Sequence, residues 1–148
     1  MATQIGAVEL GLDTHTDEGL FGWFLASLLF GRPVAPKLAA ASWRRFIADG
    51  WTEPARFVVD DPHALWEELW VANYHRLSSV MHEELRAAMT VIIADYDSSV
   101  RALVQRSASA DELSRRLQAI KGIGPKTAEI FIREIPPGLI GASAPAEE

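Results

Sequence analysis

The sequence contains no cysteine among its 148 residues. This absence excludes disulfide bonds, zinc held by cysteine and a cysteine-ligated iron–sulfur cluster. The sequence also lacks any apolar run long enough to cross a membrane. Its first residues show no basic stretch followed by an apolar core, so we expect no secretory leader and a cytoplasmic location.

Positive charge is scarce as well, since 14 Lys and Arg residues face 20 Asp and Glu residues, for a net charge of -6. An acidic chain is poorly suited to general nucleic-acid binding, because phosphate contacts dominate that affinity. The charges are unevenly spread, however. Acidic residues gather in pairs at 60–61, 67–68 and 83–84, whereas residues 113–133 hold five basic residues and one acidic residue, Glu129. Such a basic segment can bind DNA with a strong dependence on salt.

Apolar residues are abundant, at 49% of the chain with five tryptophans, which is enough to fill the core of one domain. They recur at helical spacing, and no segment alternates convincingly as a strand would. We therefore expect an all-α fold, a single compact multi-helix domain over residues 16–136. The predicted helices cover residues 16–30, 35–48, 54–59, 61–71, 77–96, 99–105, 110–120 and 125–135. Residues 1–15 are expected to be loosely ordered, and residues 137–148 to form a disordered tail.

Residues 117–134 are the most informative segment, because they read as a helix, a tight glycine turn and a second helix. Glycine at the turn permits positive φ and a close approach of the backbone to a partner. Unpaired amides at the turn and at the start of the next helix form an anion site that suits a phosphate. The predicted DNA contacts in this segment are Lys121, Gly122, Ile123, Gly124, Lys126 and Thr127.

The segment Ile120-Lys-Gly-Ile-Gly-Pro-Lys126 resembles the helix-hairpin-helix motif of the base-excision DNA glycosylases, the endonuclease III-like superfamily. Upstream, residues 24–32 resemble the apolar helix that opens the superfamily's helical domain. Residues 70–77 stand where the family has a short turn before a long helix. The resemblance implies a DNA repair protein that binds duplex DNA through its phosphate backbone.

Lys126 matches the lysine that, in bifunctional members of this superfamily, attacks the sugar and forms a Schiff base. An amine does so only when it loses its proton, which Lys121 and the helix N-terminus would favour. The alternative is a solvated lysine that binds phosphate. The family also implies an essential aspartate shortly after this lysine, and residues 139–148 contain none.

Asp13 is the candidate substitute for that acid, because Leu12-Asp13-Thr14-His15 resembles the sequence around the family's catalytic aspartate. This role requires the N-terminal segment to fold across the glycine turn. The alternative is that Asp13 turns the chain into the first helix, as such residues commonly do.

Three further features follow from the resemblance. Arg32 could fill the gap left by a flipped base, or be a surface residue favoured by a helix C-terminus. Tyr74 could stack on a base, or be a partly buried loop residue. The family also implies a monovalent cation held by the backbone carbonyls of Gln118, Ile120 and Ile123, whereas the four histidines show no metal-binding spacing.

The sequence therefore predicts a glycosylase-like protein that binds double-stranded DNA, with Lys126 and Asp13 as its candidate catalytic pair. Two alternatives remain: a catalytically inactive DNA-binding module, and a protein-interaction module that recognises a protein partner. The acidic balance favours the last of these, as does a face of aromatic residues at 66, 70 and 74.

Overall fold

The computed structural model describes residues 6–31, 35–59, 62–71 and 78–142, and throughout them the fold is all-α, as predicted. Arg32 and Tyr74 lie outside the described residues. Eight α-helices occur in these ranges: α1 (Asp17–Phe30), α2 (Pro36–Ala48), α3 (Pro54–Val59), α4 (Pro62–Val71), α5 (Ser78–Tyr96), α6 (Val100–Arg106), α7 (Ala110–Gln118) and α8 (Pro125–Arg133). All eight were predicted, and each observed end lies within two residues of the predicted one.

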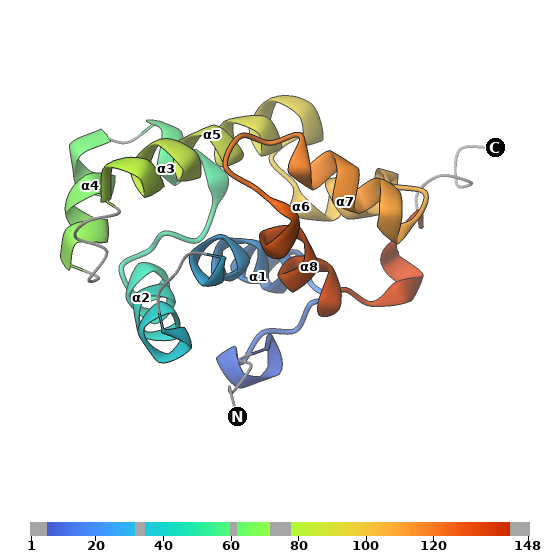
Figure 1. Cartoon of the computed structure of the whole chain (residues 1–148), viewed down its shortest axis with the longest axis horizontal. Coiled ribbons are helices and arrows are strands. Elements are labelled where there is room, and N and C mark those ends of the chain that lie inside the picture. The colour runs from blue at the N-terminus through green and yellow to red at the C-terminus, as the bar shows by residue number, and fades with distance from the viewer. Residues whose placement is uncertain (1–5, 32–34, 60–61, 72–77, 143–148) are drawn as a thin grey trace.

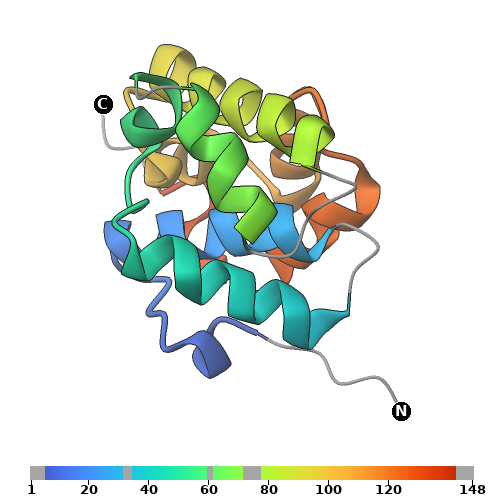
Figure 2. The same ribbon diagram turned by 90° about the vertical axis from the view of Figure 1, so that its left-hand side faces the viewer.

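The helix α1 forms the centre of the molecule, because it is apolar on every side. Residues 19–29 are all buried, and Thr16 caps the first turn by accepting a hydrogen bond from the Gly19 amide. This helix packs against α2, α6 and α8, and Figure 2 shows it between α2 and α5. Two indole N–H groups form hydrogen bonds between helices. Trp23 of α1 donates to the Phe131 carbonyl of α8 at 3.0 Å, and Trp43 of α2 donates to the Gly22 carbonyl of α1 at 2.8 Å.

The helix α5 lies along one side of the molecule and packs against α3, α4 and α6 (Figure 1). An aromatic cluster fills the space where α2 meets α3. In it, Trp51 and Phe57 have ring centres 5.0 Å apart, and both rings contact Phe46. None of the helices in the described ranges combines the length and apolar character that a membrane span requires.

Residues 6–15, part of the segment expected to be loosely ordered, make defined contacts with the helical core. A short 3-10 helix, η1 (Val8–Leu10), buries Ala7 and Leu10 against the core. The Thr14 hydroxyl then donates to the Glu134 carbonyl at 3.1 Å. Buried apolar surface and this long-range bond offset the entropy that loose order would retain.

Residues 137–142, part of the segment expected to form a disordered tail, likewise pack against the core. Here another 3-10 helix, η3 (Pro137–Leu139), is followed by a hydrogen bond from the Gly141 amide to the Val104 carbonyl at 3.4 Å. Leu139 and Ile140 supply the reason, since both pack against the core.

Candidate nucleic-acid interface

The turn between α7 and α8 is a tight reversal anchored in the core. The Ile123 amide donates to the Ile120 carbonyl at 3.1 Å, and Gly122 between them has φ +90°. Positive φ at the third position is the signature of a type II turn, which glycine adopts without strain. The side chains of Ile120 and Ile123 are both buried in the core, and they anchor the two ends of the turn. Ile123 can therefore contribute only backbone atoms to a ligand.

The helix α8 begins without a side-chain cap. Its N-cap residue is Gly124, which offers no side-chain hydrogen bond, and Pro125 occupies the first helical position. By contrast, hydroxyl groups of Thr16, Ser99 and Ser109 cap α1, α6 and α7. Amides in the first turn of α8 therefore have no side-chain cap and carry the positive end of the helix dipole.

Gly124 has no reason within the fold to be glycine. Its φ of -100° is open to any residue, and apart from its chain neighbours no atom of the described residues lies within 4 Å of the position a Cβ would take. Gly122 is different, because a Cβ there would lie 2.6 Å from the Cδ of Glu84, on α5. Figure 1 shows the turn after α7 beside α5. Packing therefore accounts for glycine at 122 but not at 124.

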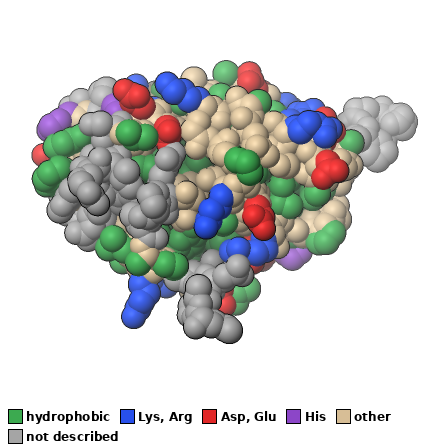
Figure 3. All heavy atoms as spheres, viewed as in Figure 1, with side chains coloured by type: hydrophobic (Ala, Val, Ile, Leu, Met, Phe, Trp, Pro, Cys, Tyr) green, Lys and Arg blue, Asp and Glu red, His purple; other side chains and the backbone are tan. Residues whose placement is uncertain are grey.

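The two lysines of the site are exposed. Lys121 lies within the turn, and Lys126 lies in the first turn of α8. Thr127 is instead buried against the end of α1: a Cβ on Gly31 would lie 2.0 Å from its hydroxyl oxygen. The Thr127 side chain thus faces the protein, so only its backbone is left to contact a ligand. On the face shown in Figure 3, basic side chains alternate with acidic ones and form no broad basic field.

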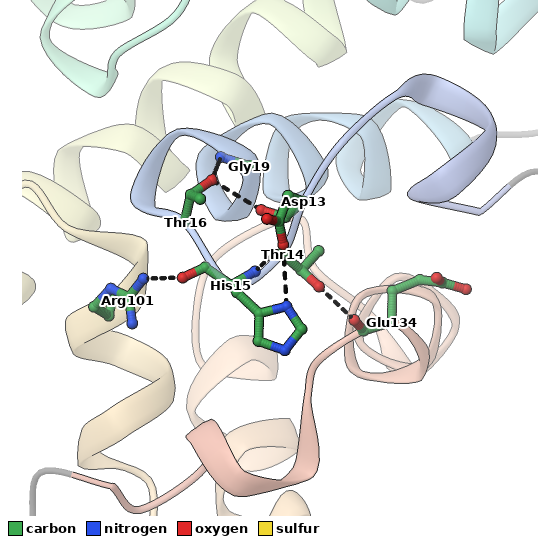
Figure 4. A network of polar contacts seen from close by, with 7 residues as sticks. All are labelled: Asp13, Thr14, His15, Thr16, Gly19, Arg101 and Glu134. Atoms are coloured by element: carbon green, nitrogen blue, oxygen red, sulfur yellow. Dashed lines mark hydrogen bonds and ion pairs between the residues drawn. The ribbon is translucent and has the colours of Figure 1, made fainter.

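Asp13 lies at the other end of α8 from Lys126. Its carboxylate accepts bonds from the His15 amide at 2.9 Å and the His15 imidazole at 3.0 Å, while its neighbour Thr14 binds Glu134 just past the helix (Figure 4). Eight residues of helix separate Glu134 from Lys126, or about 12 Å. The structure therefore does not bring the two predicted catalytic residues together.

The surroundings of Asp13 favour the charged carboxylate. The His15 amide, and then its imidazole, hold the pKa of Asp13 below its usual range. A carboxyl group that stays ionised is a poor proton donor. The carbonyl oxygen of Asp13 also accepts a bond from the Thr16 hydroxyl at 2.9 Å, so this residue shapes the entry into α1, as the alternative interpretation held.

The predicted cation ligands fit a hard monovalent ion by chemical type, since all three are neutral backbone carbonyls. The Ile120 carbonyl already accepts the turn bond from Ile123, which leaves it one lone pair. Among the described residues, no group of three or more His, Cys, Asp or Glu side chains could hold a metal ion.

A second polar cluster, on α2, α3 and α4, was not predicted. Glu68 lies 3.2 Å from the Nε of Arg45, which also pairs with Asp49 at 3.7 Å. These groups line a hollow of about 370 Å³ together with Arg56, whose guanidinium lies over the Trp51 ring at 4.3 Å. Burial, reinforced by the neighbouring Asp49 and opposed by Arg45, raises the pKa of Glu68 to about 7.

The sequence did hold a signal for both inward-facing acids. Glu68 comes three residues after the buried Leu65, and Glu84 comes three residues after the buried Met81. Residues three apart share a helix face, so the spacing places the second member of these two acidic pairs at the edge of a buried stripe.

Aromatic rings form a ladder along α4. His63 stacks on Trp66 with ring centres 5.8 Å apart, and Trp66 stacks on Trp70 at 5.4 Å. Trp70 is 45% exposed. The predicted aromatic face at 66 and 70 is therefore a stack of rings on α4, with the Trp70 ring partly exposed.

No protein-family model matches this chain, and no curated protein matches it either.

Proposed function

We propose that the α7–α8 pair binds the phosphate backbone of double-stranded DNA. The site consists of the uncapped amides at the start of α8 and the exposed Lys121 and Lys126 on either side. Helix N-termini favour anions through both their free amides and their dipole. The backbone can approach a phosphate closely at Gly124, and contacts of this kind carry no base information, so we expect little sequence preference.

The observation that carries this proposal is the open space at Gly124. A glycine with ordinary φ and no neighbour within 4 Å is not required by the fold. It is required if something outside the protein comes close to the backbone at that point. The same reasoning does not apply to Gly122, which Glu84 already contacts.

The first test replaces the glycine that the fold does not need. Gly124→Ala should leave the free energy of unfolding within about 1 kcal/mol of wild type, because the φ is ordinary and the space is free. It should weaken binding of a fluorescein-labelled duplex by about threefold or more, measured by anisotropy at low salt, because the methyl group blocks close approach. Wild-type affinity in Gly124→Ala would contradict the proposed docking.

A charge reversal provides the second test, with a closely matched control. Lys37 stands in α2 where Lys126 stands in α8, directly after a proline at an uncapped helix start. Lys126→Glu should weaken duplex binding by about tenfold and flatten its dependence on salt, because a phosphate contact is lost. Lys37→Glu makes the same change of charge elsewhere and should have a much smaller effect. Equal losses in the two variants would mean that binding does not involve the α7–α8 pair.

A Schiff-base lyase is the second candidate function, favoured by the exposed position of Lys126 beside this phosphate site. Its acid would not be Asp13, which lies at the far end of α8. Borohydride trapping on a duplex with an abasic site tests this function: an adduct in wild type and Lys121→Ala, but none in Lys126→Ala, would establish it.

The implied cation at the carbonyls of Gln118, Ile120 and Ile123 would predict tighter duplex binding in potassium than in tetramethylammonium salts of equal concentration.

A further inference from the structure

The acidic side chain of Glu84, on α5, packs against the turn. A Cβ built on Gly122 would lie 2.6 Å from both Cγ and Cδ of Glu84, and 3.0 Å from its Cβ. The contact therefore runs along the whole side chain and not merely its tip. It joins the start of α5 to the turn across a separation of 38 residues in sequence.

The contact places an acidic side chain beside the basic residues of the proposed site, Lys121 and Lys126. Lys121 precedes Gly122 directly, and the uncapped start of α8 follows two residues later. A phosphate docked at that helix start would lie near the Glu84 carboxylate, so at low salt the two anions would repel one another. Glu83, the neighbour of Glu84 on α5, is exposed to solvent and has no such contact with Gly122.

From this geometry we infer that Glu84 is a built-in counter-charge of the turn, which lowers the affinity for DNA. This inference rests on the proposed function. In the free protein the carboxylate offsets the positive charge of the turn and the helix start. When DNA binds, its phosphate must share this region with the carboxylate, so binding stays weak and readily reversible.

The test compares two substitutions that change the net charge equally. Glu84→Gln keeps the shape of the side chain against Gly122 and removes its charge, whereas Glu83→Gln removes a charge from the exposed neighbour. Glu84→Gln should bind the fluorescein-labelled duplex about 3- to 10-fold more tightly than wild type at low salt. Glu83→Gln should gain much less.

The dependence on salt separates repulsion from a purely structural role. The ratio of the dissociation constants of wild type and Glu84→Gln should shrink towards one as the salt concentration rises, because added ions screen the repulsion. If Glu84 only braces the turn, Glu84→Gln will bind no better than Glu83→Gln, or will bind more weakly at every salt concentration. Either of these results overturns the inference.

The outcome for Glu84 is distinguishable from the outcome for the proposed function. If Lys126→Glu weakens binding more than Lys37→Glu does, the α7–α8 site stands, and an unimproved Glu84→Gln then overturns the counter-charge alone. If Lys126→Glu and Lys37→Glu behave alike, the proposed site fails and the counter-charge fails with it.

Discussion

At the scale of the residue, the neighbours of a position determine which amino acid it can hold. The two glycines of the α7–α8 turn illustrate the point, since Gly122 has positive φ and touches Glu84, while Gly124 has neither constraint. Replacing Gly122 would therefore strain the backbone and push on α5 at once. Loss of DNA binding in a Gly122 variant would report damage to the fold as much as loss of a phosphate contact.

Glu68 makes the stability of the protein depend on pH. Its pKa in the folded protein is about 7, above the ordinary 4.5, so the folded state holds this proton more tightly than the unfolded state does. The stabilisation is fully present below pH 4.5 and is lost as the pH rises through 7. The contribution of Glu68 to the free energy of unfolding should fall by about 1–3 kcal/mol over this range, measured by urea denaturation at several pH values.

The matched variant for this pH dependence is Glu68→Gln, which mimics the protonated side chain. It should unfold at a higher urea concentration than wild type at pH 8 and show a flatter pH profile. Glu67→Gln, at an exposed neighbour on the same helix, should keep the wild-type profile. A wild-type profile in Glu68→Gln would show that another group is responsible.

Pairs of helices depend on close contacts at their ends. The end of α1 meets the start of α8 where a Cβ on Gly31 would lie 2.0 Å from the Thr127 hydroxyl oxygen. Gly31→Ala should therefore destabilise the protein by about 1–3 kcal/mol, because it overpacks this junction. Thr127→Ala removes the hydroxyl, so the double variant should recover part of the loss, measured as coupling in a double-mutant cycle of thermal unfolding. Simple additivity of the two changes would contradict the contact.

The start of α7 depends on two reciprocal bonds. The Ser109 hydroxyl accepts from the Glu112 amide at 3.1 Å, and the Glu112 carboxylate accepts from the Ala108 amide at 2.7 Å. Ser109→Ala should lower the free energy of unfolding by about 1 kcal/mol. Ser109→Asp retains an acceptor and is the control that should preserve stability, whereas equal losses in both variants would rule out the cap.

At the scale of the whole molecule, the segment before α1 and the segment after α8 both contribute to the fold. The N-terminal segment buries Ala7 and Leu10 and binds the end of α8 through Thr14. Removing residues 1–11 should therefore lower the midpoint of thermal unfolding, by several degrees for a domain of this size, because buried apolar surface is lost. Circular dichroism melting measures the change, and an unchanged midpoint would mean that this segment adds no stability.

The sequence by itself determined the helices and the local chemistry of the turn. Proline, glycine and capping residues act on neighbours a few positions away, so the bounds of α1 to α8 and the exposed Lys121 and Lys126 could be predicted.

Only the tertiary structure decided which distant residues meet. Glu84 against Gly122, Thr127 against Gly31, and Asp13 at the far end of α8 from Lys126 all depend on how helices pack, and a local pattern carries no information about the partner of a side chain. The packing of residues 6–15 and 137–142 was decided in the same way, because these segments contact helices remote in the sequence. Packing thus settled the surroundings of the candidate site, whose residues local sequence had already marked.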